Sequence, residues 1–189
     1  MLSMLTEEPD AYLAQLQAAK LNDDVEVAHY AATAVAQISK ESDLKLQQLE
    51  RAFKTDPSAQ NLNEYCDFLG EYLCSGLAEG RVAQIQRQQY ARLLARRCER
   101  EDTLELRIRY ATALADVGQI DEAQAVTNQL VLDVPEEQEV WMLCLRLAVM
   151  CRDGDEVHRV IDAIDKQHVY LSADNREKLA FWRDGEEVR

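Results

Sequence analysis

The sequence predicts an all-α fold. Glycine and proline interrupt helices and are scarce, with 6 Gly and 3 Pro among 189 residues. Helix-favouring Ala, Leu, Glu, Gln and Arg dominate, and the alternation of β-branched residues that marks strands is absent. Two segments, 104–135 and 138–169, also align at an offset of 34 residues, and each has the pattern of two helices joined by a turn.

The chain divides into nine expected helices. In order they span 8–20, 25–54 (one long helix or two nearly continuous ones), 62–77, 82–98, 104–115, 121–132, 138–150, 155–166 and 172–183. The first has an apolar stripe that includes Leu13 and Leu16, and Thr6 is its candidate cap. Asn22 and Asp23 are the candidate caps of the second helix.

The third and fourth helices are predicted from apolar residues on one side. In the third, these residues recur at i, i+3, i+4 and i+7, at Tyr65, Phe68, Leu69 and Tyr72. In the fourth, the residues expected to face inward are Ile85, Tyr90, Leu93 and Leu94. A long stretch separates the two helices, so they fit a 34-residue register poorly. This spacing predicts an irregular hairpin.

The two aligned segments predict a regular repeat. Ala123 and Val157 occupy matching positions in the seam between the two helices of each hairpin. Gly118 turns the first hairpin, whereas Gly154 comes two positions later in the second copy. We therefore expect the first helix of the second hairpin to be longer and its turn to be tighter.

The last helix is expected to cover the end of the array. Ser172 is its candidate N-cap, and it carries Leu179, Phe181 and Trp182. A terminal repeat needs such a cover because its outer apolar face has no further neighbour. A polar tail follows from Gly185.

The aligned pair resembles the tetratricopeptide (TPR) superfamily. Ala123 and Pro135 stand at the alanine and proline positions of that motif, and Trp141 and Ile161 keep the register in the second copy. The turn and Ala-rich helix at 23–37 are similar to a HEAT-type hairpin. These resemblances imply a right-handed α-solenoid of TPR-like helical hairpins with a HEAT-like N-terminal hairpin and a C-terminal capping helix. Its parts are HEAT-like and TPR-like helices at 1–57, an irregular TPR-like hairpin at 58–102, TPR hairpins at 103–135 and 136–169, and the capping helix and tail at 170–189.

The resemblance also implies a binding face, because the first helix of each TPR hairpin lines the concave side. The residues expected there are Glu105, Ile108, Thr112, Ala115, Asp116, Glu139, Met142, Arg146, Val149 and Met150. Several of these residues are apolar, and an exposed apolar patch indicates a partner site. The equally weighted alternative is that neighbouring repeats or the last helix cover these residues. The paired Lys and Asn with which one TPR subtype clamps chaperone tails are absent, so a chaperone-tail adaptor is not expected.

The charge argues against nucleic acid as a partner. The formal net charge is −14, from 35 acidic and 21 basic residues, and nucleic-acid binding normally needs a basic face. One Arg-rich stretch, 81–109, is either a local basic stripe or a solvated helical face that balances the acidic remainder. No run of apolar residues approaches the length of a membrane span.

The sequence contains no recognisable catalytic or metal-binding motif, so we expect no enzyme activity, no cofactor and no metal. The three histidines, His29, His158 and His168, lack zinc-ligand spacing, and no Gly-rich phosphate loop occurs. The five cysteines include no C-x-x-C pair. They are expected to be reduced and buried, as in a reducing compartment.

A narrower resemblance joins the segment 23–37, the stretch 45–51 and the ending around Phe181 and Trp182. Together with the repeats, they resemble the soluble region of the PelE family, the TPR-bearing component of the bacterial Pel exopolysaccharide machinery. This resemblance implies a non-enzymatic scaffold at the cytoplasmic face of the inner membrane, held there only through an N-terminal segment outside this chain. Its partners would be other membrane-associated Pel proteins. The alternative is a soluble regulatory sensor that binds a peptide or small ligand. The sequence predicts no oligomeric state.

Overall fold

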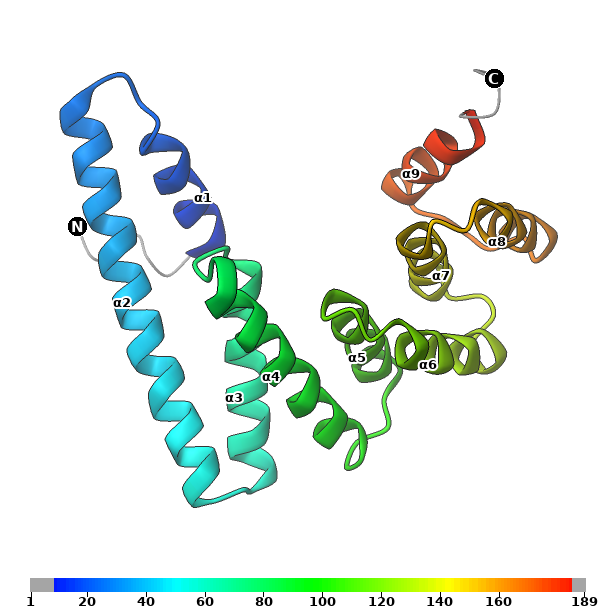
Figure 1. Cartoon of the computed structure of the whole chain (residues 1–189), viewed down its shortest axis with the longest axis horizontal. Coiled ribbons are helices and arrows are strands. Elements are labelled where there is room, and N and C mark those ends of the chain that lie inside the picture. Colours follow the sequence, from blue (N-terminus) through cyan, green and yellow to red (C-terminus); the bar gives the residue numbers. More distant parts are fainter. Residues whose placement is uncertain (1–8, 185–189) are drawn as a thin grey trace. The chain divides into compact units, whose positions relative to one another are not determined.

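The computed structural model describes residues 9–184, and every regular element in that range is an α-helix (Figure 1). The helices are α1 (Pro9–Ala19), α2 (Val25–Thr55), α3 (Ala59–Cys74), α4 (Gly80–Cys98), α5 (Leu104–Asp116), α6 (Ile120–Asp133), α7 (Gln138–Cys151), α8 (Gly154–Lys166) and α9 (Ala173–Asp184). The all-α prediction is confirmed. Thr6 and the tail from Gly185 lie outside the described residues.

The chain divides into two compact units, one up to Tyr90 and one from Ala91. The division falls inside α4, within the region 58–102 that the sequence predicts as one irregular hairpin. Across the described range, none of the helices combines the length and the apolar character needed to cross a membrane.

In the first unit, α2 is one continuous helix of 31 residues and not two. Its N-cap is Asp24, whose carboxylate accepts hydrogen bonds from the backbone N–H groups of Glu26 and Val27. The predicted caps Asn22 and Asp23 were therefore wrong. The side chain of Asn22 instead accepts the backbone N–H of Asp24 at 2.9 Å and so holds the true cap in place.

The core of the first unit lies where α2 packs on α3. Of the predicted apolar side of α3, Tyr65, Leu69 and Tyr72 are buried, and Phe68 is half-buried. The Tyr65 ring contacts Phe53 of α2 at a centroid distance of 6.2 Å. The Tyr72 hydroxyl donates to the Asp43 carboxylate at 2.7 Å, so a polar contact also joins the two helices.

Helix α4 departs from the prediction at one apolar position. Leu93 and Leu94 are buried, but Ile85 is 55% exposed. Successive residues turn by about 100° around a helix, so nine residues place Ile85 opposite Leu94. The inward side at the start of α4 is instead formed by the buried Ala83.

The cysteines are less buried than the sequence predicts. Only Cys66 is buried, while Cys98 and Cys144 are half-buried and Cys74 and Cys151 are exposed. Cys74 and Cys151 are the last residues of α3 and α7, where the helices leave the core. Helical periodicity alone does not reveal where the core ends.

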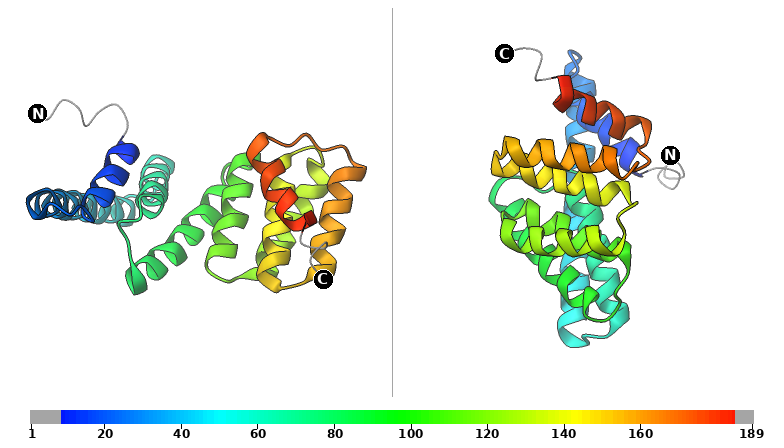
Figure 2. Two further views of the ribbon diagram at one scale, coloured as in Figure 1. Left: turned by 90° about the horizontal axis from the view of Figure 1, so that it is seen from above. Right: turned by 90° about the vertical axis from the view of Figure 1, so that its right-hand side faces the viewer.

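In the second unit, the hairpin α5–α6, the hairpin α7–α8 and then α9 follow one another in layers (Figure 2). The two hairpin turns have the same hydrogen bonds at an offset of 34 residues. The matched bonds are Gly118 N–H to Ala115 O (3.0 Å) with Arg152 N–H to Val149 O (3.0 Å), and Gln119 N–H to Leu114 O (2.9 Å) with Asp153 N–H to Ala148 O (3.1 Å). The pattern is a Schellman motif, which satisfies carbonyl groups at a helix C-terminus.

The difference between the two turns also follows the prediction. Helix α7 has 14 residues and α5 has 13, and α8 begins immediately after Asp153. Asp153 caps α8 by accepting the backbone N–H of Glu156, whereas Gln119 makes no side-chain cap for α6. The second hairpin therefore has the longer first helix and the tighter turn.

Replacing Arg152 with glycine is expected to raise the free energy of unfolding by about 0.5–1 kcal/mol, because glycine adopts the left-handed conformation without a steric cost. Arg152 has φ 56° at the position that Gly118 fills, with φ 79°, in the first hairpin. Urea denaturation of the wild type and R152G checks this. Gly118→Ala is the matched variant and should lose stability. If both variants gained stability, or neither did, the assignment of these two positions to the left-handed conformation would be contradicted.

The core of the second unit gathers around α7. Trp141 is 5% exposed and packs in one apolar cluster with Val157, Ile161 and other residues of α7 and α8. Leu171 and Leu179 join this cluster, so α9 and the segment before it pack on the last hairpin. The predicted cap of α9 is confirmed, since the Ser172 hydroxyl accepts the backbone N–H of Asn175 at 3.3 Å. Phe181 is 71% exposed on the outer side of α9.

Candidate functional site

The predicted partner-binding residues lie on α5 and α7, which contact each other directly. Thr103 caps α5 by accepting the backbone N–H of Leu106 at 3.3 Å, and Glu137 caps α7 by accepting that of Glu139 at 3.4 Å. These caps fix where each helix begins, and therefore which residues share a side. We refer to nine of the predicted residues on these helices as the α5/α7 face: Glu105, Ile108, Thr112, Asp116, Glu139, Met142, Arg146, Val149 and Met150.

One residue of the predicted set is not on the surface. Ala115 is 1% exposed and lies in an apolar cluster with Ala123 of α6 and with Leu143 and Leu147 of α7. The expectation that Ala115 is exposed was wrong. A small side chain is required there because the second hairpin packs against the end of α5.

The remaining residues of the face divide by exposure. The exposed residues are Glu105, Asp116, Glu139, Arg146 and Met150, and the half-buried ones are Ile108, Thr112, Met142 and Val149. Met142 and Val149 pack against the apolar cluster of α7, α8 and α9, which covers part of their surface. The surface that is accessible to a partner is therefore more polar than the sequence suggests.

An ion pair links the two helices across this face. The Arg146 guanidinium donates to the Asp116 carboxylate, and both side chains remain partly exposed. An exposed pair of this kind contributes about 0–1 kcal/mol, so its larger effect is to fix the two side chains relative to each other. Sequence reasoning named both residues but did not predict their pairing.

Some arginines of the predicted Arg-rich stretch are buried or form contacts within the protein. Arg107 donates to the Asp133 carboxylate at 2.6 Å, and this hydrogen bond lowers the pKa of Asp133. Arg97 is buried, whereas Arg81 and Arg92 are exposed on α4. The stretch therefore does not form one continuous surface.

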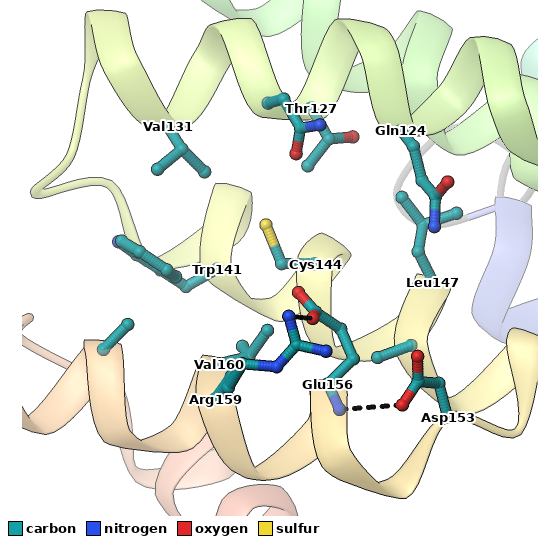
Figure 3. A pocket seen from close by; sticks show the side chains of 13 residues that line it. Gln124, Thr127, Val131, Trp141, Cys144, Leu147, Asp153, Glu156, Arg159 and Val160 are labelled. Atoms are coloured by element: carbon teal, nitrogen blue, oxygen red, sulfur yellow. Dashed lines mark hydrogen bonds and ion pairs between the residues drawn. The ribbon is translucent and has the colours of Figure 1, made fainter.

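Sequence reasoning missed a groove on the other side of α7 (Figure 3). Its volume is about 420 Å³, and it lies among α6, α7 and α8. The lining residues are Gln124, Thr127, Asn128 and Val131 of α6, Trp141, Cys144, Leu147 and Ala148 of α7, Asp153, and Glu156, Arg159, Val160 and Ala163 of α8. Cys144 and Arg146 are two positions apart, which turns their side chains about 200° from each other and separates the groove from the α5/α7 face.

The two ends of the groove differ in polarity. In Figure 3, Val131 and Trp141 lie at one end, and Gln124 and Asp153 lie at the other. The Trp141 indole N–H donates to the Pro135 carbonyl at 2.7 Å, which fixes the ring at the apolar end. The groove is therefore amphipathic along its length.

Thr127 and Cys144 add two small polar groups to the groove. Thr127 is 1% exposed, and its hydroxyl donates to the Ala123 carbonyl at 2.7 Å. The hydroxyl is therefore satisfied within α6 and is almost fully covered. Burial, and then the nearby Glu156 carboxylate, raise the pKa of Cys144 to about 12. The thiol is therefore protonated near neutral pH and is a poor nucleophile.

The chain matches no family model, no curated protein and no solved structure. Among the described residues, no group of three or more His, Cys, Asp and Glu side chains is arranged to hold a metal ion. The α5/α7 face and the groove are the two candidate sites among the described residues.

Proposed function

We propose that this protein is a non-enzymatic protein–protein interaction scaffold, built as a right-handed α-solenoid of TPR-like hairpins. The observation that carries the proposal is the exact 34-residue spacing of the matched hydrogen bonds in the turns of α5–α6 and α7–α8. Hairpins that repeat in this way stack into extended surfaces that bind other chains. The α5/α7 face would hold a helix or extended segment of the partner.

The proposed partners are other components of the Pel exopolysaccharide machinery, in line with the resemblance of 23–37 and 45–51 to the PelE family. In that setting the protein assembles the inner-membrane synthase complex from the cytoplasmic side during biofilm formation. The partners to test are the glycosyltransferase, the cyclic-di-GMP receptor and the transporter-like protein of that machinery.

A pulldown with purified Pel components tests the α5/α7 face. We expect Arg146→Glu combined with Met150→Glu to reduce capture of the partner by tenfold or more, or about 1.4 kcal/mol, because the first reverses a charge and the second places a charge on an exposed apolar residue. Met150 is 42% exposed, so its substitution spares the core, whereas Met142 packs against the apolar cluster.

The control is Arg176→Glu, which makes the same charge reversal as Arg146→Glu on an exposed residue of α9. This control should leave capture unchanged. Undiminished capture by the double variant, with its circular dichroism spectrum intact, would place the partner elsewhere. Failure of every Pel component to bind the wild type would reject the Pel assignment itself.

The second candidate function is a regulatory sensor that binds a peptide or small ligand. The amphipathic groove favours it, because a volume of about 420 Å³ lies in the range of ligand pockets. Thermal stabilisation of the isolated protein by a ligand, without any protein partner, would distinguish the sensor from the scaffold.

A further inference from the structure

The groove among α6, α7 and α8 has the size of a small-molecule site. Ligand pockets span roughly 300–1,000 Å³ and combine an apolar lining with a few polar groups that fix the orientation of the ligand. The groove meets the size criterion, with a volume of about 420 Å³, and its lining mixes apolar residues with about as many polar and charged ones. A helix, whose diameter with side chains is roughly 10–12 Å, is too large for this volume, which fits a compact ligand or one or two side chains.

The space is left open by small side chains. Thr127 of α6, Cys144 and Ala148 of α7, and Ala163 of α8 line the groove at positions where larger residues would fill the space. Trp141 and Val160 then provide apolar walls. An apolar ligand body placed there would be removed from water on several sides, which is the main source of affinity in such a site.

The charged groups at the rim favour a cationic ligand. Glu156 and Asp153 are the lining carboxylates, and Arg159 is the lining cation. Asp153 is held in place because it caps α8, accepting the Glu156 backbone N–H at 2.9 Å. The whole chain is also acidic, with a formal net charge of −14, which raises the local concentration of cations.

The Glu156–Arg159 ion pair is built so that a ligand can replace it. The Arg159 guanidinium lies 2.7 Å from the Glu156 carboxylate, but its side chain is 69% exposed, compared with 38% for Glu156. Exposed ion pairs between neighbouring helix turns contribute little to stability. Arg159 therefore loses little by turning into solvent, while Glu156 remains at the groove to receive another cation.

We propose that this groove binds a small amphipathic cation, with its ammonium or guanidinium group on Glu156 in place of Arg159 and its apolar body against Trp141 and Val160. This assignment rests on the second candidate function and gives it a ligand class. It is independent of the α5/α7 face, so its failure leaves the scaffold proposal standing.

Titration of the full chain with three probes of equal chain length tests the charge preference. The probes are n-hexylamine, n-hexanol and n-hexanoate, followed by NMR on the indole N–H signals of the two tryptophans. We expect hexylamine to shift the Trp141 signal saturably, hexanol to bind about tenfold more weakly, and hexanoate to cause no shift. Trp182 does not line the groove but lines a separate hollow on α9, so its signal reports binding outside the groove. Equal binding of the three probes, or equal shifts of both tryptophans, overturns the proposal.

Substitutions at the ion pair test the named contact. Glu156→Gln should weaken hexylamine binding about tenfold, and Arg159→Gln should strengthen it about threefold because the competing cation is gone. Asp162→Asn is the matched control, since it removes one exposed negative charge from α8 outside the groove, and it should change the affinity by less than about twofold. Unchanged affinity in E156Q, with the fold intact by circular dichroism, overturns the assignment of Glu156.

A further pair of probes distinguishes the two sources of such a cation. Nα-acetyl-lysine N-methylamide represents a lysine within a protein, and hexylamine represents a free amine. Binding of the lysine derivative at least as tight as that of hexylamine indicates a partner's side chain, and binding of hexylamine alone indicates a free small molecule. Binding of neither overturns the proposal.

Discussion

Replacing Trp141 with alanine is expected to lower the free energy of unfolding by about 3–5 kcal/mol, the range for deleting a large buried aromatic side chain. The ring is 5% exposed and lies in the apolar cluster that joins α7, α8 and α9. The substitution also leaves the Pro135 carbonyl without the indole N–H that donates to it at 2.7 Å. Urea denaturation measures the loss, with the fluorescence of Trp182 as a reporter in the same unit.

Two further variants separate packing from hydrogen bonding. Trp141→Phe keeps much of the apolar volume but removes the N–H donor, so a loss of about 1–3 kcal/mol is expected. Trp182→Ala, at a half-buried position on α9, should cost less than W141A. Equal losses for W141A and W182A would show that the cluster around Trp141 is not the centre of this core.

The repeat was the most predictable part of the fold, because its signals are local. The two turns keep the same pair of backbone hydrogen bonds at an offset of 34 residues. Gly118 has the positive φ expected of a turn glycine, but in the second hairpin Arg152 takes that position and Gly154 begins α8. The seam residues Ala123 and Val157 are both buried. The existence of each helix can be predicted from local periodicity, whereas its ends are less predictable, as the cap of α2 and the bounds of α3 show.

Two predictions of burial or exposure were wrong, for different reasons. Periodicity predicts an apolar side for α4, yet Ile85 lies outside it and Ala83 takes the inward position. Ala115 was assigned to the surface, but the second hairpin covers it. For Ala115, its own helix gives no information about the neighbour that packs on it. For Ile85, the helical period itself places the residue opposite Leu94.

The groove was not predictable from the sequence for a related reason. It depends on the combined volumes of side chains from three helices, and no single helix marks the gap. The only sequence signal is a set of small residues at positions facing the seam, including Thr127, Cys144 and Ala148. Small residues at such positions equally allow close helix packing, so the sequence alone does not distinguish a tight seam from a groove.

Helix α7 is central to both proposals. One side contributes Arg146 and Met150 to the α5/α7 face, and the opposite side contributes Trp141 and Cys144 to the groove. A ligand that orders the groove side therefore acts on the same helix that a partner protein would contact. Substitutions on either side test the two functions separately, since the two sets share no residue.

Stability is expected to fall as the pH rises from 10 to 12, because two buried tyrosines of the first unit must stay protonated. Burial, and then the Glu50 charge, raise the pKa of Tyr65 to about 12. Burial, followed by the hydrogen bond to Asp43 and its charge, raise the pKa of Tyr72 to about 12. Their ordinary pKa is 10.0, so the unfolded chain releases these protons first.

The direction of the change in stability follows from the number of protons that the folded and unfolded states bind. Below pH 10 both states hold the protons and the stabilisation is complete, whereas between pH 10 and pH 12 only the folded state holds them. Each tyrosine is expected to cost about 2 kcal/mol by pH 12. Urea denaturation across this interval measures the fall, and the double variant Tyr65→Phe with Tyr72→Phe should flatten it. Tyr170→Phe, at a position that is 79% exposed, is the matched control and should keep the wild-type slope. If the double variant also kept that slope, Tyr65 and Tyr72 would not be the groups that limit the fold in alkali.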